Sequence, residues 1–208
     1  MIKLSNTVTP NTSAMSSVIR GMRNPMNSWD KSDSFDGDLK LGENDAKLMK
    51  SLSRSGASHA KYRRMMVVYV DILAPLYWWK EFDTYKVGTV ANSCSTMHKI
   101  ASKPFVKGDF SNEHLTPESR QLLGVIVDQL NAAREEYLED HEEGAWWQMI
   151  QLLPSSYNQK RTVMLNYEVL ANMYYDRRNH KLHEWRTFCR WIEKLPYFDT
   201  VIKEDYHG

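Results

Sequence analysis

The sequence predicts an α+β protein of α/β type, with a small central sheet flanked by long helices. Residues 65–75 (MMVVYVDILAP) are almost continuously apolar and rich in β-branched and aromatic residues, which is typical of a strand buried on both faces. Apolar residues recur at spacings of three and four over 116–140, 166–178 and 180–195, which is typical of amphipathic helices. This combination favours helices around a small sheet over a helical bundle.

The composition is that of an ordinary globular protein, with 42% hydrophobic and 25% charged residues in 208. We expect a single domain over 1–208, divided into an N-terminal helix and loop (1–42), a strand and ligand-loop half (43–100), a helical half (116–195) and a tail (196–208). A formal net charge of +1 provides no global field for nucleic acid, so no specific nucleic-acid partner is expected.

The two cysteines, Cys94 and Cys189, are far apart and have no metal-ligand spacing. This usage predicts a reduced, cytoplasmic location and no zinc site. The N-terminus lacks an apolar segment of signal-peptide length, and no window approaches the roughly 18 apolar residues of a membrane span, so no membrane partner is expected. Seven Trp and eleven Tyr indicate either a thick core with an oligomer interface, which is the commoner use, or stacking on a ligand.

The N-terminal part is predicted to begin with a polar, loosely held segment over 1–12 and a helix over 13–23. That helix must end before Pro25, because the residue before proline avoids helical geometry. Residues 27–42 are rich in Asp, Ser and Gly and predict an ordered surface loop. Alternating acidic residues suggest calcium there, but their spacing departs from the EF-hand pattern, so a solvated loop is favoured.

Helical spacing over 43–54 predicts the next helix, with Gly56 as its stop. In the strand 65–75, Asp71 must face the strand's end or have a partner. Pro75 ends this strand and begins a short helix at its first turn.

The long helix begins at Thr116, a hydroxyl N-cap followed by proline, and runs to about Asp140. Acidic residues near its end suggest a metal site, but like charges at i,i+4 repel and no His-x-x-Glu pattern accompanies them, so a solvated helix end is favoured. Gly144 is expected to break this helix before another over 145–153, and residues 160–165 form a short strand or an extended entry to the last two helices.

The stretch 77–99 (YWWKEFDTYKVGTVANSCSTMHK) combines two adjacent Trp with a dense set of hydrogen-bonding side chains. Such a combination suits a flat polar ligand such as a nucleotide or a flavin. A polar loop after a buried strand explains the composition equally well.

The order of these parts resembles the flavin-dependent thymidylate synthase family. Gly56-x-Ser-His59 precedes a strand that ends in Ala-Pro75, and a polar Ser/Asn-rich turn follows. The family's signature there is Arg-His-Arg-x-x-Ser-x-Asn-Glu-x-Ser-x-Arg-Tyr. The corresponding stretch starts at Thr84 and has one extra residue; Asn92 and Ser95 match, whereas the Arg-His-Arg triplet, the Glu and the final Arg-Tyr do not.

The C-terminal half resembles the family more clearly, and the likeness covers roughly 43–100 and 145–190. The matching residues, in the family's order and spacing, are Leu153, Pro154, Tyr157, Asn166, Leu170, Asn172 and Arg177, followed after about one deleted residue by Glu184 and Arg186.

The resemblance implies two sets of binding residues and no identified catalytic residue or metal ligand. The FAD set is His59, Tyr85, Lys86, Asn92, Asn166 and Asn172. The set for deoxyuridylate (dUMP) is Glu81, Ser93, Ser95 and Arg177. Asn suits the edge of a flavin or pyrimidine ring because it donates and accepts, and a guanidinium suits a phosphate.

Each of these residues also has a structural interpretation. Asn166 is a good N-cap, and Asn172 can be plain helix surface. Arg177 can complement a helix C-terminus, and His59 can cap or bridge.

Where the family signature provides phosphate-binding arginines, this chain has Thr84, Tyr85 and Met97, and Ile150 replaces another. Losing a guanidinium removes a charge-assisted hydrogen bond, so phosphate affinity should fall unless other cations take over. The candidate substitutes are Lys86, His98, Lys99 and Lys103. This departure implies either a relocated phosphate site or an altered substrate.

Two functions follow. The first is a divergent flavoenzyme that binds a pyrimidine nucleotide and methylates dUMP, with reduced FAD, NADPH and methylenetetrahydrofolate; a reactive Cys94 aided by His98 is a minor alternative. The second is a non-catalytic nucleotide-binding, regulatory or structural homo-oligomer of the same fold. In the family the site forms between subunits of a homotetramer, so we expect an oligomer in either case.

Overall fold

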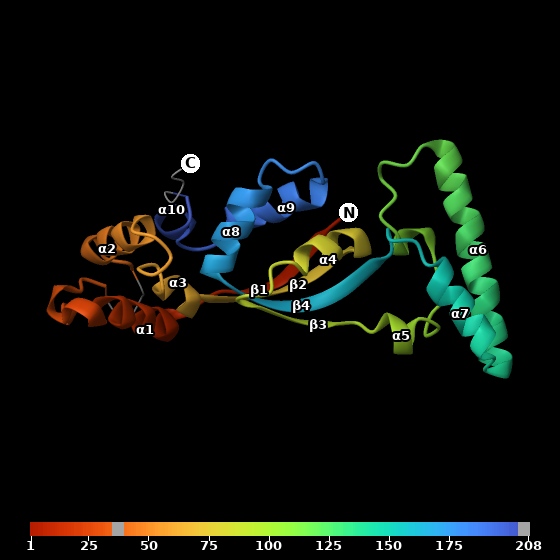
Figure 1. The fold of residues 1–208 in the computed structure, drawn as a ribbon, viewed down its shortest axis with the longest axis horizontal. Helices are drawn as coiled ribbons and strands as arrows, with labels where there is room; N and C mark the ends of the chain where they lie inside the picture. Colours follow the sequence, from red (N-terminus) through yellow and green to blue (C-terminus); the bar gives the residue numbers. More distant parts are fainter. Residues whose placement is uncertain (35–39, 204–208) are drawn as a thin grey trace. The chain divides into compact units, whose positions relative to one another are not determined.

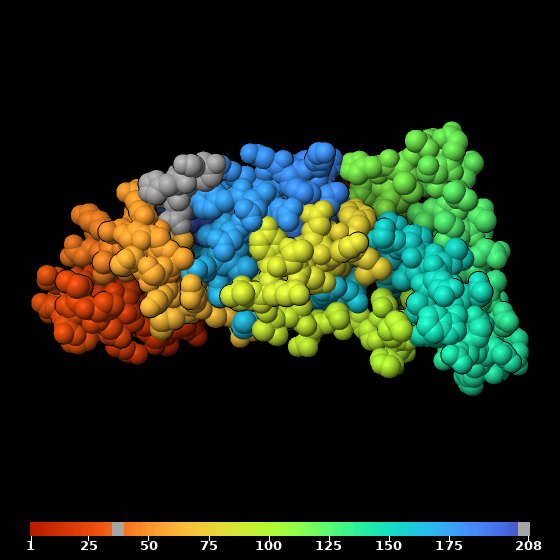
Figure 2. Space-filling view, in the orientation of Figure 1, coloured from red at the N-terminus to blue at the C-terminus, as the bar shows by residue number. Residues whose placement is uncertain are grey.

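The computed structural model describes residues 1–34 and 40–203, so parts of the expected loop 27–42 and tail 196–208 lie outside the described residues. Figure 1 shows the helices and strands, and Figure 2 shows the same orientation as a space-filling view. Their bounds are β1 Lys3–Val8, α1 Thr12–Arg23, η1 Asn24–Met26, η2 Trp29–Lys31, α2 Glu43–Arg54, α3 Tyr62–Met65, β2 Val67–Pro75, α4 Leu76–Phe82, β3 Thr89–Ser93, α5 Thr96–Lys99, η3 Lys107–Asp109, α6 Pro117–Asp140, α7 Glu143–Leu152, β4 Asn158–Asn166, α8 Tyr167–Arg177, α9 His183–Ile192 and α10 Phe198–Val201.

The chain divides into two compact units, which are described separately. Unit 1 comprises residues 1–3, 72–84 and 92–161. Unit 2 comprises residues 4–71, 85–91 and 162–208. The expected division of one domain into consecutive parts stays a prediction.

The α+β class predicted from the sequence is confirmed, with a four-stranded sheet in the order β1-β2-β4-β3. β2 and β4 are antiparallel, because Leu76 N–H donates to Tyr157 O at one end and Tyr167 N–H donates to Met66 O at the other, both at 3.0 Å. One face of β4 is turned to the core, where Val163 and Leu165 are fully buried.

The burial of β2 differs from the expectation of two buried faces. Val68, Val70 and Ile72 are fully buried on one side, whereas Tyr69 on the other is 48% exposed. An antiparallel sheet can leave one face open, which an apolar run in the sequence does not reveal. Asp71 lies on the less buried face and has the partners it needs: it accepts from Asn6 Nδ2 at 2.9 Å and from Thr162 Oγ1 at 2.6 Å.

Two strands were not predicted. Residues 1–12 were expected to be loosely held, but Lys3–Val8 forms β1; Thr89–Ser93, expected to be loop, forms β3. Both strands lie at the edges of the sheet, and most of their residues are exposed. Edge strands are stabilised by backbone pairing with few buried side chains, so their sequences carry little apolar signal.

The predicted helices are confirmed, with two differences at their ends. α6 ends at Asp140, as predicted, but its stop is the C-cap His141, which adopts a left-handed conformation with φ of 54°, and not Gly144, which lies within α7. α9 begins at His183 and ends at Ile192, shorter than the expected 180–195, because the chain is still extended at Leu182.

In unit 1, α6 and α7 lie side by side (Figure 1). Their apolar faces share a core with the segment after α5, and its buried members include Ile100, Phe105, Phe110, Leu123, Val127, Leu130 and Met149. This core fixes the segment 100–110, which forms one side of the candidate site. Among the described residues, no helix combines the length and the apolarity that a membrane span requires.

Candidate functional site

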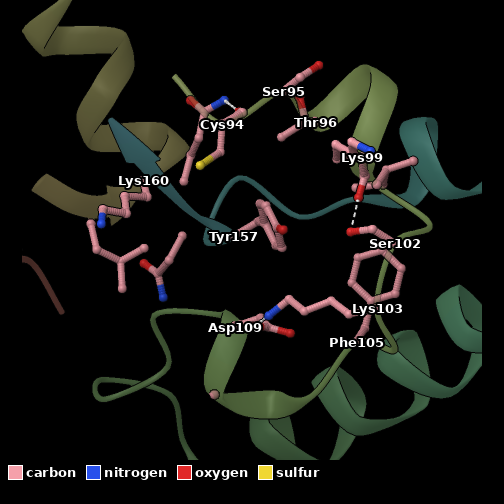
Figure 3. Close-up of a pocket in the computed structure, with 15 residues that line it drawn as sticks. Cys94, Ser95, Thr96, Lys99, Ser102, Lys103, Phe105, Asp109, Tyr157 and Lys160 are labelled. Atoms are coloured by element: carbon pink, nitrogen blue, oxygen red, sulfur yellow. Dashed lines mark hydrogen bonds and ion pairs between the residues drawn. The ribbon is translucent and has the colours of Figure 1, made fainter. Parts of the chain in front are cut away.

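Unit 1 contains a cavity of about 470 Å³ between the segment after β3, the segment after α5 and the start of β4 (Figure 3). This volume lies in the usual range of small-molecule sites, about 300–1,000 Å³. The lining residues that carry polar chemistry or a ring include Cys94, Ser95, Lys99, Lys103, Phe105, Asp109, Tyr157 and Lys160. We call it the lysine cavity.

Local hydrogen bonds hold the β3–α5 side of the lysine cavity in place. Cys94 N–H donates to Lys160 O at 2.9 Å, and Gln159 Nε2 donates to Cys94 O at 2.8 Å. Ser95 is the N-cap of α5, because its hydroxyl oxygen accepts from His98 N at 3.0 Å. The segment that carries Cys94 and Ser95 is therefore fixed on β4.

The opposite side is built around Asp109. Its Oδ1 accepts from Lys103 Nζ at 2.6 Å, as Figure 3 shows, and its Oδ2 accepts from Val106 N at 3.0 Å. The hydrogen bond to Asp109 raises the pKa of Lys103, so this side chain stays cationic. The side-chain amide of Asn131 fixes the backbone of Phe105: Phe105 N–H donates to Asn131 Oδ1 at 2.8 Å, and Asn131 Nδ2 donates to Phe105 O at 2.9 Å.

Aromatic rings form the wall between the lysines. Tyr157 lies at the centre of the close-up, with its ring edge-on to Phe105 at 6.3 Å and to Phe110 at 5.6 Å between centroids. Burial, helped by the charge of Asp109, raises the pKa of Tyr157, so the phenol stays neutral. Lys99, Lys103 and Lys160 thus line the cavity beside this neutral, partly apolar wall, and Asp109 balances the charge of Lys103. The remaining positive charge suits a flat ligand that carries negative charge.

The stretch 77–99 has two different parts. Trp78 and Trp79 are at most 1% exposed, and Trp79 Nε1 donates to Gln159 O at 2.9 Å. The guanidinium of Arg161 lies 4.2 Å from the Trp79 ring and donates to Asp83 at 2.7 Å. The Trp pair therefore serves the core, and the polar end of the stretch lines the cavity.

The other residues predicted in unit 1 do not line the lysine cavity. Asn92 and Ser93 are exposed on β3, and Glu81 lies on α4, where its carbonyl accepts from Thr84 Oγ1 at 2.7 Å. Of the substrate residues predicted in this unit, the structure places Ser95 alone at the cavity, among the residues it describes.

In unit 2, Arg177 is held by two aromatic rings. Its guanidinium carbon lies 5.1 Å from the centre of the Trp185 ring and 5.5 Å from that of Tyr85. Arg177 Nε donates to Tyr85 Oη at 2.9 Å, and Tyr85 Oη donates to Asp176 Oδ2 at 3.0 Å. Burial raises the pKa of Tyr85; Asp176 also raises it, while Arg177 opposes both. Tyr85 therefore positions Arg177.

Asn166 has the structural role that its position at a helix start suggested. Its side-chain oxygen accepts from Val169 N at 3.0 Å and caps α8. Its amide also packs against Gly88, where a Cβ atom would lie 2.4 Å from Asn166 Nδ2. Gly88 has a φ of 84°, so glycine is required there for conformation as well as for space.

Asn172 lines a separate cavity of about 220 Å³ in unit 2, with Arg54, Gly56, Arg63 and Glu168 among the other lining residues. Glu168 Oε1 accepts from Arg64 Nη2 at 3.0 Å, but Oε2 is buried and has no hydrogen-bond partner in the described part of the chain. His59 and Lys86 are exposed and do not line this cavity.

Sequence reasoning missed Lys160, Phe105 and Asp109 as cavity residues. Lys99 and Lys103 had been named as substitutes for the absent arginines, and both line the cavity. No local pattern marks Lys160 or Asp109, because β4 and the 103–109 segment meet through the fold. Within 1–34 and 40–203, no group of three His, Cys, Asp or Glu residues is arranged to hold a metal ion.

Comparison of the sequence finds no matching family model and no curated protein. Comparison of the structure finds thymidylate synthase X from Helicobacter pylori, in a crystal structure with FAD and dUMP: the TM-score is 0.69 at 15% identity, over 100% of both chains. A second structure from that organism, described as a flavin-dependent thymidylate synthase with FAD and dUMP, gives 0.68 at 16% identity over 98% of each chain.

The UMP/dUMP methylase PolB from Streptomyces cacaoi, bound with 5-Br dUMP, gives a TM-score of 0.62 at 15% identity, over 98% of this chain and 93% of the methylase. Identities this low establish the fold alone. The sequence resemblance is thereby confirmed in its structural content: the chain has the fold of the flavin-dependent thymidylate synthases.

Proposed function

We propose that the protein binds a pyrimidine nucleoside monophosphate in the lysine cavity and uses FAD to methylate its base. The observation that supports nucleotide binding is the cavity itself, which Lys99, Lys103 and Lys160 line together with Tyr157. The solved structures of the same fold support the proposal, because the thymidylate synthase X from Helicobacter pylori binds FAD and dUMP and PolB is a UMP/dUMP methylase.

In this proposal the lysines take over the phosphate from the missing arginines. An ammonium group is a point charge without the fork geometry of guanidinium, so three lysines around one cavity attract phosphate with less angular selection. The Tyr157 ring supports the base, and the Ser95 hydroxyl oxygen accepts a hydrogen bond from an N–H of the pyrimidine.

The small cavity of unit 2 fits one edge of a flavin. The orphaned Glu168 Oε2 requires a donor, and a flavin ring has an N–H between two carbonyl groups on its pyrimidine edge. Asn172, in the same cavity, offers both a donor and an acceptor. Reduced flavin supplies a hydride when it is bound, and a folate supplies the one-carbon unit. NADPH is proposed as the reductant.

A second candidate is nucleotide binding without catalysis. The observation that favours it is the aromatic clamp of Tyr85 and Trp185 on Arg177, which engages the arginine expected at the substrate. Met97 also provides no charge where the family has a guanidinium, and it is 48% exposed.

A nucleotide titration tests the binding step. We expect dUMP binding by isothermal titration calorimetry, weakened about tenfold or more in Lys99→Ala, Lys103→Ala and Lys160→Ala. Lys80→Ala is the matched control, because Lys80 is exposed in unit 1 away from the cavity. Saturating dUMP should also slow alkylation of Cys94, which lines the cavity. Binding unaffected by all three lysine variants would overturn the assignment.

Flavin binding and turnover separate the two candidates. The purified protein, or the protein titrated with FAD, should show a flavin absorption spectrum, and Glu168→Gln should weaken FAD binding because a carboxylate acceptor is lost. With FAD, NADPH and methylenetetrahydrofolate, dUMP should be converted to thymidylate. Binding of dUMP without flavin binding or turnover would leave the non-catalytic candidate.

A homotetramer in the cytoplasm is proposed with this function. Exposed apolar side chains support an interface: Leu122 and Val125 on α6 are 61% and 56% exposed, and Trp147 on α7 is 43% exposed. Light scattering should give a tetramer mass, and a monomer at micromolar concentration would exclude it.

A further inference from the structure

A second cavity, of about 250 Å³, lies within unit 2 between α1 and the segment 29–34 (α1 is red in Figure 1). Its lining residues are Ser16, Ile19, Arg20, Arg23, Trp29, Ser32 and Ser34. We call it the α1 cavity. It lies outside the two stretches, 43–100 and 145–190, whose sequence resembles the thymidylate synthases.

Arg23 is a buried cation with donor capacity left over. It is 4% exposed; its Nε donates to Asp45 Oδ1 at 2.6 Å and its Nη1 donates to Ser28 O at 3.1 Å. Nη2 makes no hydrogen bond with any residue that the structure describes. Because Arg23 lines the α1 cavity, this nitrogen is available to an acceptor placed there.

Asp45, the carboxylate that pairs with Arg23, already has hydrogen-bond donors for both of its oxygens. Asp45 is fully buried, and its Oδ2 accepts from the hydroxyls of Ser32 at 2.8 Å and Ser34 at 2.7 Å. The backbone N–H groups of Asp33 and Ser34 donate to the same oxygen, at 3.2 and 3.1 Å. The Asp45 acceptors are thus occupied, and the hydroxyl protons of Ser32 and Ser34 are donated to Asp45.

Arg20 and Trp29 complete the lining. Arg20 is exposed on α1, and its Nη2 makes a long 3.3 Å hydrogen bond to Ser17 Oγ. Trp29 is 50% exposed, but its ring is oriented, because Nε1 donates to Asn24 Oδ1 at 2.8 Å. An apolar Ile19 and a fixed indole therefore stand beside two guanidinium groups.

We propose that the α1 cavity binds a nucleoside monophosphate, with the phosphate on Arg20 and Arg23 and the base stacked on Trp29. Guanidinium groups are well suited to phosphate, and an indole face accepts any base. The cavity is much larger than a phosphate ion, which is why a planar group is part of the ligand. The site shares no residue with the lysine cavity, so it stands or falls independently of the proposed function.

Fluorine NMR of the full-length protein labelled with 5-fluorotryptophan tests the site. The chain has seven Trp, and the resonance missing in Trp29→Phe identifies Trp29. Titration with AMP should shift the Trp29 resonance in a saturable way, whereas adenosine and inorganic phosphate should each bind about tenfold more weakly or worse. UMP in place of AMP measures the base preference.

Arg20→Ala should weaken AMP binding at Trp29 about tenfold or more without unfolding the protein, because Arg20 is exposed. Arg190→Ala is the matched control: Arg190 is also an exposed helix arginine that donates to a hydroxyl three residues earlier, Thr187 Oγ1, at 2.8 Å. Lys103→Ala should leave the Trp29 titration unchanged.

Two outcomes would overturn the proposal. One is a Trp29 resonance that does not move with any mononucleotide, and the other is an affinity that Arg20→Ala and Arg190→Ala alter equally. Phosphate that binds as tightly as AMP would remove the base from the ligand and overturn the stacking role of Trp29.

Discussion

The lysine cavity of unit 1 and the α8 region of unit 2 differ in what their polar side chains adjoin. In the cavity, three lysines and Ser95 line open space of about 470 Å³, although Lys103 is also paired with Asp109 and Ser95 caps α5. Around α8, Asn166 caps its own helix and Arg177 is held by Tyr85 and Trp185. The sequence made the α8 residues the stronger candidates for ligand contacts, yet the fold engages two of them internally.

The difference shows why residue type and order identify a fold better than they identify a site. The capping Asn166 and the clamped Arg177 have structural roles of their own, so their presence does not by itself indicate a ligand. A phosphate site needs cations around a cavity, and several segments can supply them. The phosphate function can therefore move while the helix stays.

The two cysteines provide the largest expected contrast between these regions. Cys94 is exposed at the lysine cavity, whereas burial raises the pKa of Cys189 in α9 to about 12. At pH 8 about one Cys189 thiol in ten thousand is ionised, so Cys189 should resist alkylation in the native protein. Mass spectrometry after brief iodoacetamide treatment should find Cys94 modified at least about a thousandfold faster. Comparable rates would mean that α9 opens readily.

The buried ion pair of unit 2 should contribute far more to stability than the exposed pair of unit 1. Asp45→Asn leaves Arg23 buried without its counter-charge and should cost about 3–5 kcal/mol in the free energy of unfolding by urea titration. Asp83→Asn, whose aspartate is half exposed beside Arg161, should cost less than about 1 kcal/mol. Equal destabilisation by the two substitutions would contradict the difference in burial between the Arg23–Asp45 pair and the Arg161–Asp83 pair.

The same pair makes stability depend on pH. Burial alone would raise the pKa of Asp45, but hydrogen bonds from Ser34, Ser32 and Arg23 outweigh it and hold the pKa below its ordinary value. A lowered pKa stabilises the native state above the unfolded-state pKa, and this contribution is lost as the pH falls through the folded-state value. Asp45→Asn should remove that acid-side loss.

A set of glycine variants tests how tightly Asn166 is held. Gly88→Ala should destabilise by about 2–3 kcal/mol, since it adds a steric clash with Asn166 to the cost of a positive φ. Gly56→Ala has the positive φ without a neighbour and should cost about 1 kcal/mol. Gly108→Ala in unit 1 meets nothing and should be neutral in chemical denaturation. A different order would show that the Gly88–Asn166 contact is loose.

The smallest expected effect separates capping from ligand contact. Asn166→Ala should lower stability by about 1 kcal/mol, because it removes the cap of the eleven-residue α8. Ser95→Ala removes the cap of the four-residue α5 and should change stability by less than that, while it weakens dUMP binding. Loss of dUMP binding in Asn166→Ala at unchanged stability would reverse the assignment of the two residues.

The sequence by itself determined the fold class, the main helices and the buried strand, because periodic apolar residues and capping signals are local. α2 begins at Glu43 and ends at Arg54, as predicted, and the long α6 ends at its predicted limit, Asp140. The order of parts also predicted the thymidylate synthase fold, which the structure comparison confirmed.

The tertiary structure decided the rest. The edge strands β1 and β3 gain their stability from backbone pairing with a neighbour, which leaves little trace in their own sequences. The cavity joins Lys99, Lys103 and Lys160 from segments some sixty residues apart at most, and Arg177 meets Tyr85 across ninety-two positions. Contacts between residues so far apart in the sequence depend on the tertiary fold, and no local sequence pattern encodes them.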